Sequence, residues 1–90
     1  MAERRDKLKI VYDILKSIQD KGGHIKPTHL LYKSNLSHQK MQFYLKDLIE
    51  KNLVEEGKNK IKREYNITNK GVKFLEDYKR IKEFTDSFGF

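Results

Sequence analysis

Side chains that could bind a polyanion are concentrated in two parts of this 90-residue sequence. Residues 21–46 contain five lysines, three histidines and no acidic residue, and residues 57–63 contain four further Lys and Arg. The formal net charge of the whole chain is +7, so these two segments hold all of the excess positive charge. Clustered positive charge of this kind is typical of proteins that bind nucleic acids. The alternative is a basic protein whose charge serves only to keep it soluble.

Other kinds of chemistry find little support in the sequence. The absence of Cys excludes disulfides, thiolate zinc sites and cysteine nucleophiles. The histidines, His24, His29 and His38, follow no zinc-binding spacing, so we expect no bound metal. The chain has no glycine-rich phosphate loop, no paired carboxylates in a catalytic arrangement and no nucleophile elbow. We therefore expect neither an enzyme nor a cofactor or small-molecule ligand.

The hydrophobic residues are too dispersed for a membrane protein. No apolar run approaches the roughly 18–20 residues that a membrane span needs, and the N-terminus lacks the apolar core of a signal peptide. We expect a cytoplasmic protein of one small domain with no membrane partner. Because only 37% of the residues are hydrophobic, a partner subunit would help to stabilise it.

The positions of apolar, capping and turn residues predict a mainly α fold with a small β-hairpin. Apolar residues with helical spacing predict a first helix, which paired glycines end, and a proline opens the second. Ser37 and Thr68 stand where N-caps of the third and last helices are expected. The expected elements are helices at about 3–20, 27–35, 37–51 and 69–87, and strands at 53–56 and 61–67 around a tip at 57–60.

The third helix has one apolar and one polar side. At 100° per residue, one side carries Met41, Tyr44, Leu45, Leu48 and Ile49. The other side carries Gln39, Gln42, Phe43, Lys46 and Glu50. Two helices joined by a short turn, the second with a polar outer side, are typical of a helix-turn-helix, and the basic hairpin that follows makes it a winged helix. The sequence therefore predicts a winged helix-turn-helix over residues 1–68, with its wing at about 53–67, and a separate C-terminal helix over 69–90.

Such a fold is expected to bind double-stranded DNA with its third helix in the major groove and its wing along the adjacent backbone or minor groove. Gln39 and Gln42 are the candidates for reading base edges, and Lys46 for a guanine edge or a phosphate. Phe43 has two interpretations, contact with a thymine methyl group or cover for a neighbouring element. Any single lysine can equally be a solvated surface charge. The complete predicted DNA-binding set is Lys26, Lys33, Ser37, His38, Gln39, Lys40, Gln42, Phe43, Lys46, Lys58, Lys60, Lys62 and Arg63.

The last helix carries a narrow apolar seam. Its residues recur at spacings of four and three, as in a coiled coil about two heptads long. Such a seam predicts self-association into a two-fold symmetric homodimer, and the alternative is that the helix folds back onto the body. The predicted dimer interface consists of Phe74, Tyr78, Ile81, Phe84, Thr85 and Phe88.

Several short motifs, taken in order, resemble those of a known family. They are Asn35-Leu36-Ser37, Tyr44-Leu45, Leu48, Asn52-Leu53-Val54, Tyr65-Asn66-Ile67-Thr68, Lys70-Gly71 and Phe74-Leu75. Together they resemble the small archaeal winged-helix DNA-binding proteins, especially the crenarchaeal "10a" nucleoid proteins. The resemblance implies a dimer formed by an antiparallel coiled coil of the last helices, and duplex DNA binding as a chromatin protein or transcriptional regulator.

Lysines outnumber candidate base readers on the sides expected to be exposed, so the sequence favours a nucleoid-associated protein of low sequence specificity. A sequence-specific transcriptional regulator on the same scaffold is the first alternative. The second is a winged-helix module that binds proteins, and the third and weakest is RNA binding.

Overall fold

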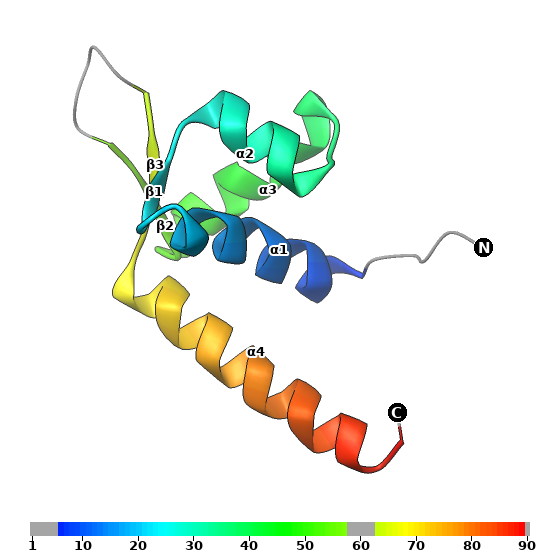
Figure 1. The fold of residues 1–90 in the computed structure, drawn as a ribbon. Helices are drawn as coiled ribbons and strands as arrows, with labels where there is room; N and C mark the ends of the chain where they lie inside the picture. The colour runs from blue at the N-terminus through cyan, green and yellow to red at the C-terminus, as the bar shows by residue number, and fades with distance from the viewer. Residues whose placement is uncertain (1–5, 58–62, 90) are drawn as a thin grey trace.

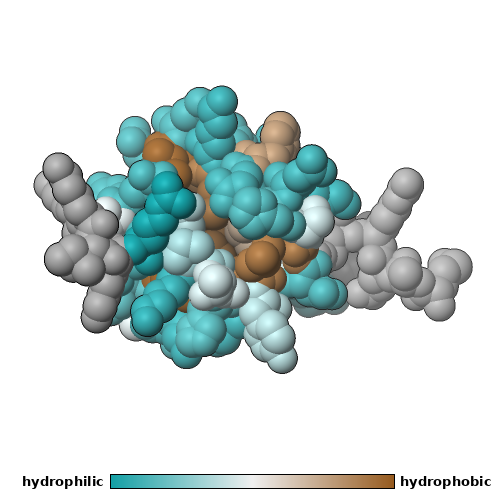
Figure 2. Space-filling view, turned by 90° about the horizontal axis from the view of Figure 1, so that it is seen from above, coloured by the Kyte–Doolittle hydropathy of each residue, from teal (hydrophilic) through white to brown (hydrophobic). Residues whose placement is uncertain are grey.

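The computed structural model describes residues 6–57 and 63–89, which form four helices and one small sheet (Figure 1). The elements in chain order are α1 (Lys7–Asp20), β1 (His24–Ile25), α2 (Pro27–Ser34), α3 (His38–Glu50), β2 (Val54–Glu56), β3 (Tyr65–Ile67) and α4 (Asn69–Ser87). This order confirms the predicted winged helix-turn-helix with a C-terminal helix. Viewed from above α2, hydrophilic residues cover most of the surface, and apolar residues are visible in patches between them (Figure 2).

The predicted caps begin the third and last helices. The Ser37 hydroxyl oxygen accepts a hydrogen bond of 3.2 Å from the Lys40 amide, and the Thr68 hydroxyl oxygen accepts one of 3.0 Å from the Gly71 amide. Each satisfies an N–H group that the helix itself leaves without a partner. Between α2 and α3, Asn35 takes the left-handed conformation with φ of 52°, which ends α2 and turns the chain into α3.

The first helix starts later than predicted. Asp6 is extended, and its carboxylate accepts a 2.8 Å hydrogen bond from the Lys9 amide, so α1 begins at Lys7 instead of about residue 3. An Asp at this position favours the start of a helix, because its carboxylate accepts a hydrogen bond from a first-turn amide that has no partner within the helix. At the other end, Gly22 and Gly23 have φ of 82° and 96°, which confirms the predicted stop.

The sheet has one strand more than the predicted hairpin. All pairs are antiparallel in the order β1-β3-β2, with Ile25 opposite Tyr65 and Val54 opposite Ile67. Strand β1 has only two residues, too few for an alternating pattern to show in the sequence. Strand β3 begins at Tyr65, and residues 63 and 64 of the predicted return strand are not in a strand. Residues 58 to 62 lie outside the described part of the chain; they include three residues of the predicted tip at 57–60 and the first two of the predicted return strand.

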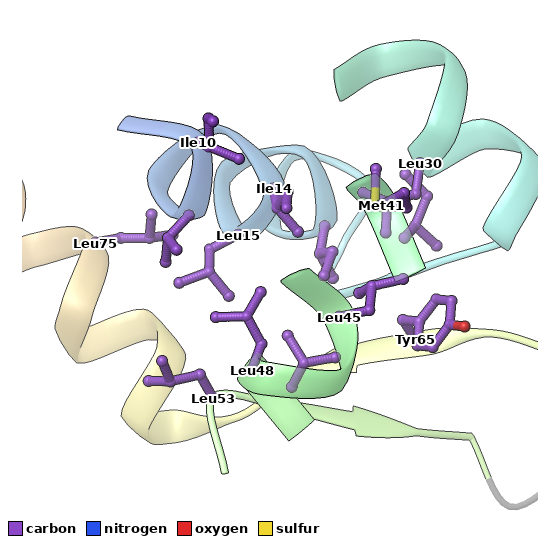
Figure 3. Packing of buried hydrophobic residues seen from close by; sticks show 14 residues of the cluster. Ile10, Ile14, Leu15, Leu30, Met41, Leu45, Leu48, Leu53, Tyr65 and Leu75 are labelled. Atoms are coloured by element: carbon purple, nitrogen blue, oxygen red, sulfur yellow. The ribbon is translucent and has the colours of Figure 1, made fainter. Parts of the chain in front are cut away.

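The core lies between α1, α3, the sheet and the start of α4 (Figure 3). Ile14, Leu15 and Ile18 of α1 are completely buried, as the helical spacing predicted. Leu48 of α3 and Leu75 of α4 pack into the same cluster. This core fixes which side of α3 faces outward.

Gly71 marks the point where α4 passes closest to the hairpin. A Cβ atom at Gly71 would lie 2.5 Å from the Leu53 carbonyl oxygen and 2.7 Å from Ile67 Cγ1. Although Ala favours helices, Gly71→Ala is expected to lower the free energy of unfolding by about 1–3 kcal/mol because backbone must move. Asn69→Ala, an exposed change in the same turn, is the control and should change it by less than about 0.5 kcal/mol. Urea denaturation measures both, and a Gly71→Ala chain as stable as wild type would contradict the close packing.

The distal half of α4 leaves the body of the domain (Figure 1). Near its start, the ring of Tyr78 stacks on Tyr12 of α1 with centroids 4.7 Å apart. Further along, Ile81, Phe84 and Phe88 are each more than 60% exposed. The fold thus covers the first half of the helix and leaves these apolar side chains of its far end in solvent.

Candidate nucleic-acid interface

The outer side of α3 is open along its length. Gln39, Gln42, Phe43 and Lys46 are all exposed, whereas Met41, Leu45 and Leu48 on the other side are at most 2% exposed. The division between the two sides of this helix that the sequence predicted is confirmed. Amide and ammonium groups on one exposed stripe of a helix are suited to the donor and acceptor edges of a DNA groove.

Phe43 is 68% exposed, and its ring meets the Tyr44 ring edge-on, with centroids 5.5 Å apart. Within the described part of the chain the ring is therefore mostly uncovered, and residues 58 to 62 of the predicted hairpin lie outside that part. A large apolar ring held in solvent beside two amides remains available for an apolar contact with a ligand.

The start of α3 and the outer side of α2 extend this open surface. Ser37 and His38 are exposed at the N-terminus of α3, where backbone amides favour an anion. Lys26 immediately precedes α2, and Lys33 lies in its last turn; both are exposed. Figure 2, which views this end of the molecule, shows a mostly hydrophilic surface.

Tyr32 is an exposed residue of this surface that was not predicted from the sequence. It is 87% exposed on α2, between the exposed His29 and Lys33. The sequence did contain a sign of it, because residues 29, 32 and 33 have the i, i+3, i+4 spacing of one helix side. A phenol hydroxyl on this side can donate a hydrogen bond to a phosphate oxygen.

Carboxylates neutralise lysines elsewhere in the described chain but not on this surface. Ion pairs join Lys9 to Asp13, Lys16 to Asp20, Lys7 and Lys51 to Asp47, and Lys73 to Asp77. The hydrogen bond to Asp20 raises the pKa of Lys16, and that from Lys51 lowers the pKa of Asp47. Within residues 6–57 and 63–89 no carboxylate pairs with Lys26, Lys33, Lys40 or Lys46. Their charges remain available to an external anion.

The base of the wing lies beside α3. The Gly57 amide donates a 2.8 Å hydrogen bond to the Glu64 carbonyl oxygen, which closes the hairpin, and Arg63 is exposed next to it. The predicted wing cations Lys58, Lys60 and Lys62 lie outside the described residues. Between α3 and the hairpin runs an open groove of about 390 Å³, lined by Gln42, Leu45, Lys46, Ile49, Glu50, Glu56 and Tyr65.

The histidines do not form a metal centre. His24, His29 and His38 are all exposed, and in the parts of the chain described here no three His, Asp or Glu side chains converge. None of the helices described here is long and apolar enough to cross a membrane.

The six residues predicted for a dimer interface fall into two groups. Phe74 and Tyr78 contact their own chain: Phe74 packs on the core, and Tyr78 lies between Phe74 and Tyr12. Ile81, Phe84 and Phe88 are exposed, and Thr85 is half-buried. The Phe84 and Phe88 rings also touch each other, with centroids 5.1 Å apart.

Comparison with known proteins assigns the class. A model of the winged helix-turn-helix family matches residues 4–86, and the chain belongs to this family. It is a family of binding domains, in agreement with the expectation that the chain is not an enzyme. No curated protein sequence matches the chain.

Several solved structures share the fold. One is Sso10a-2, a DNA-binding protein from Sulfolobus solfataricus, with a TM-score of 0.75 and 23% identity over 94% of this chain and 90% of that one. F93 from STIV, a winged-helix DNA-binding protein, has a TM-score of 0.71 and 18% identity over 86% of this chain and 90% of that one. Bordetella bronchiseptica BpsR has a TM-score of 0.74 and 13% identity over 87% of this chain and 61% of that chain. The resemblance to the 10a proteins is thus confirmed in the fold.

Proposed function

We propose that the chain is a homodimeric winged-helix protein that binds double-stranded DNA with low sequence specificity, as a chromatin-like or architectural component of the nucleoid in the cytoplasm. The observation that carries the proposal is the open side of α3, where exposed amides lie among lysines that no carboxylate of the described chain neutralises. In this arrangement α3 enters the major groove, and Lys26, Lys33 and Lys40 bind phosphates.

Low specificity follows from the balance of contacts. The open surface offers four lysines against two glutamines that can pair with a base edge. Phosphate contacts release counterions at any sequence, so they contribute most of the binding free energy without discriminating between sites. Sso10a-2 and F93, which share the fold, are both DNA-binding proteins, and this supports the same partner for the present chain.

The dimer is supported by the exposed apolar half of α4. Exposure of apolar rings to water is unfavourable, and Phe84 and Phe88 form an apolar patch on a chain of which 37% of the residues are charged. Such a patch indicates that another surface covers the two rings. A second copy placed on a two-fold axis would cover both aromatic rings and present two α3 helices to one DNA molecule or two.

An electrophoretic shift with random-sequence duplex at moderate salt tests the proposed function. We expect a shift for the random duplex, weakening steeply as salt is added. A chain that shifts no duplex at low salt would instead be a protein-interaction module, and a shift only with single-stranded RNA would favour RNA binding.

The exposed amides of α3 favour a second candidate, a sequence-specific regulator. If Gln39 and Gln42 read adenine edges, Gln39→Ala and Gln42→Ala are expected to reduce the preference for the best site about 5- to 100-fold each, with little loss on random duplex. Genomic footprinting followed by competition binding measures this preference. Even genomic coverage, together with unchanged selectivity in both variants, would remove the two glutamines as readers.

A further inference from the structure

Two carboxylates interrupt the proposed DNA-binding surface. Gln42, Lys46 and Glu50 are spaced four residues apart, so they form one line along α3 that faces the hairpin. Glu56 of β2 lines the opposite side of the same groove. Along α3 the side chains on this line are therefore the Gln42 amide, the Lys46 ammonium group and the Glu50 carboxylate. Glu56 of the hairpin adds a second carboxylate to the same groove.

Both carboxylates are open to solvent. Glu50 and Glu56 are exposed, and within the described ranges neither forms an ion pair. Four other carboxylates differ from these two, because each forms an ion pair with a lysine that partly neutralises its charge. They are Asp13, Asp20, Asp47 and Asp77. Among the described residues that line the groove, Lys46 is the one cation, and it lies one helical turn from Glu50.

The groove between a reading helix and a wing is where one DNA backbone must pass when both elements contact the duplex. With a rise of about 1.5 Å per residue, Glu50 lies roughly 12 Å along the helix axis from Gln42, further than a Debye length of about 8 Å in physiological salt. A backbone lying over Gln42 is thus largely screened from Glu50, whereas one lying over Lys46 is only about 6 Å along the axis from it. A backbone shifted toward the end of α3 meets both carboxylates directly.

We propose that Glu50 and Glu56 are specificity-determining residues that repel phosphate from the C-terminal end of α3 and restrict the duplex to its first turns. This inference rests on the proposed DNA binding and adds a restriction on how the duplex lies. The two carboxylates lower the affinity for random DNA and leave one register favoured over its neighbours.

The test measures binding of the full-length chain and its Glu50→Gln/Glu56→Gln variant to a fluorescent random-sequence duplex at several salt concentrations. Removing both charges is expected to raise affinity about five-fold at low salt, with the gain disappearing at high salt. Glu76→Gln/Glu83→Gln, two exposed acids of α4, gives the same change in net charge as a control and should gain less than about two-fold. Thermal unfolding of each variant confirms that it is folded.

The outcomes separate the inference from the proposed function. Failure of the unchanged chain to bind any duplex overturns both. Binding by the unchanged chain, with no greater gain for Glu50→Gln/Glu56→Gln than for the control, overturns only the role of the carboxylates. A loss of affinity in the groove variant also overturns it, because the carboxylates would then accept hydrogen bonds from bases, as acidic side chains do from cytosine amino groups.

Discussion

A Lys33→Gln/Lys40→Gln/Lys46→Gln variant is expected to bind random-sequence duplex about 100-fold more weakly than the unchanged chain at moderate salt. Each lysine is exposed on α2 or α3 without an ion pair in the described chain, so each can neutralise one phosphate. Losing three such contacts should also make the plot of log affinity against log salt shallower by about three units per chain. Fluorescence anisotropy over a salt series measures both quantities.

The control removes the same net charge from other surfaces. Lys16→Gln/Lys73→Gln/Lys79→Gln changes exposed lysines of α1 and α4, two of which are already paired with Asp20 and Asp77. Its affinity should fall by less than about five-fold, since distant charges are screened by salt. Equal losses in the two variants would show that net charge alone, not the α2–α3 surface, attracts the DNA.

A Phe84→Ser/Phe88→Ser variant is expected to sediment as a monomer of 10.8 kDa, whereas the unchanged chain is expected to sediment at twice that mass. Both rings are about two-thirds exposed in the single chain, so the fold itself should tolerate their loss. Binding to a duplex long enough for both subunits should weaken about 100-fold, because a monomer loses the second, tethered contact.

Leu8→Ser is the matched control for this variant. Leu8 is 57% exposed on α1, which makes it an apolar surface residue that the proposed interface does not include. It should leave both mass and affinity unchanged. An unchanged chain that sediments as a monomer with and without duplex would remove the dimer from the account and leave the fold intact.

The helices could be predicted from the sequence because local chemistry fixes where they begin and end. Ser37 and Thr68 cap α3 and α4 through their own hydroxyl groups, and the spacing of Met41, Leu45 and Leu48 determines which side of α3 is buried. The spacing of the buried residues was enough to predict which side of α3 is exposed to solvent. Strand β1 escaped prediction because pairing with β3 holds its two residues, and that contact is distant in sequence.

Periodicity shows that a helix side is apolar but not which partner covers it. Tyr78 fits the seam predicted for a dimer, yet its ring stacks on Tyr12 of the same chain. Phe84 and Phe88 lie further along α4, where this helix has diverged from α1 (Figure 1), and both stay exposed. The groove acids Glu50 and Glu56 are close only because α3 and the hairpin pack together, so their juxtaposition required the structure.

The most direct test of the central claim is the affinity of the unchanged chain for random-sequence duplex, measured from about 50 to 300 mM salt. If the unpaired lysines of α2 and α3 bind phosphates, log affinity falls linearly with log salt, with a slope of about −3 or steeper. An affinity that stays constant across this range, or no binding at its lowest salt concentration, would contradict the claim that this surface binds DNA.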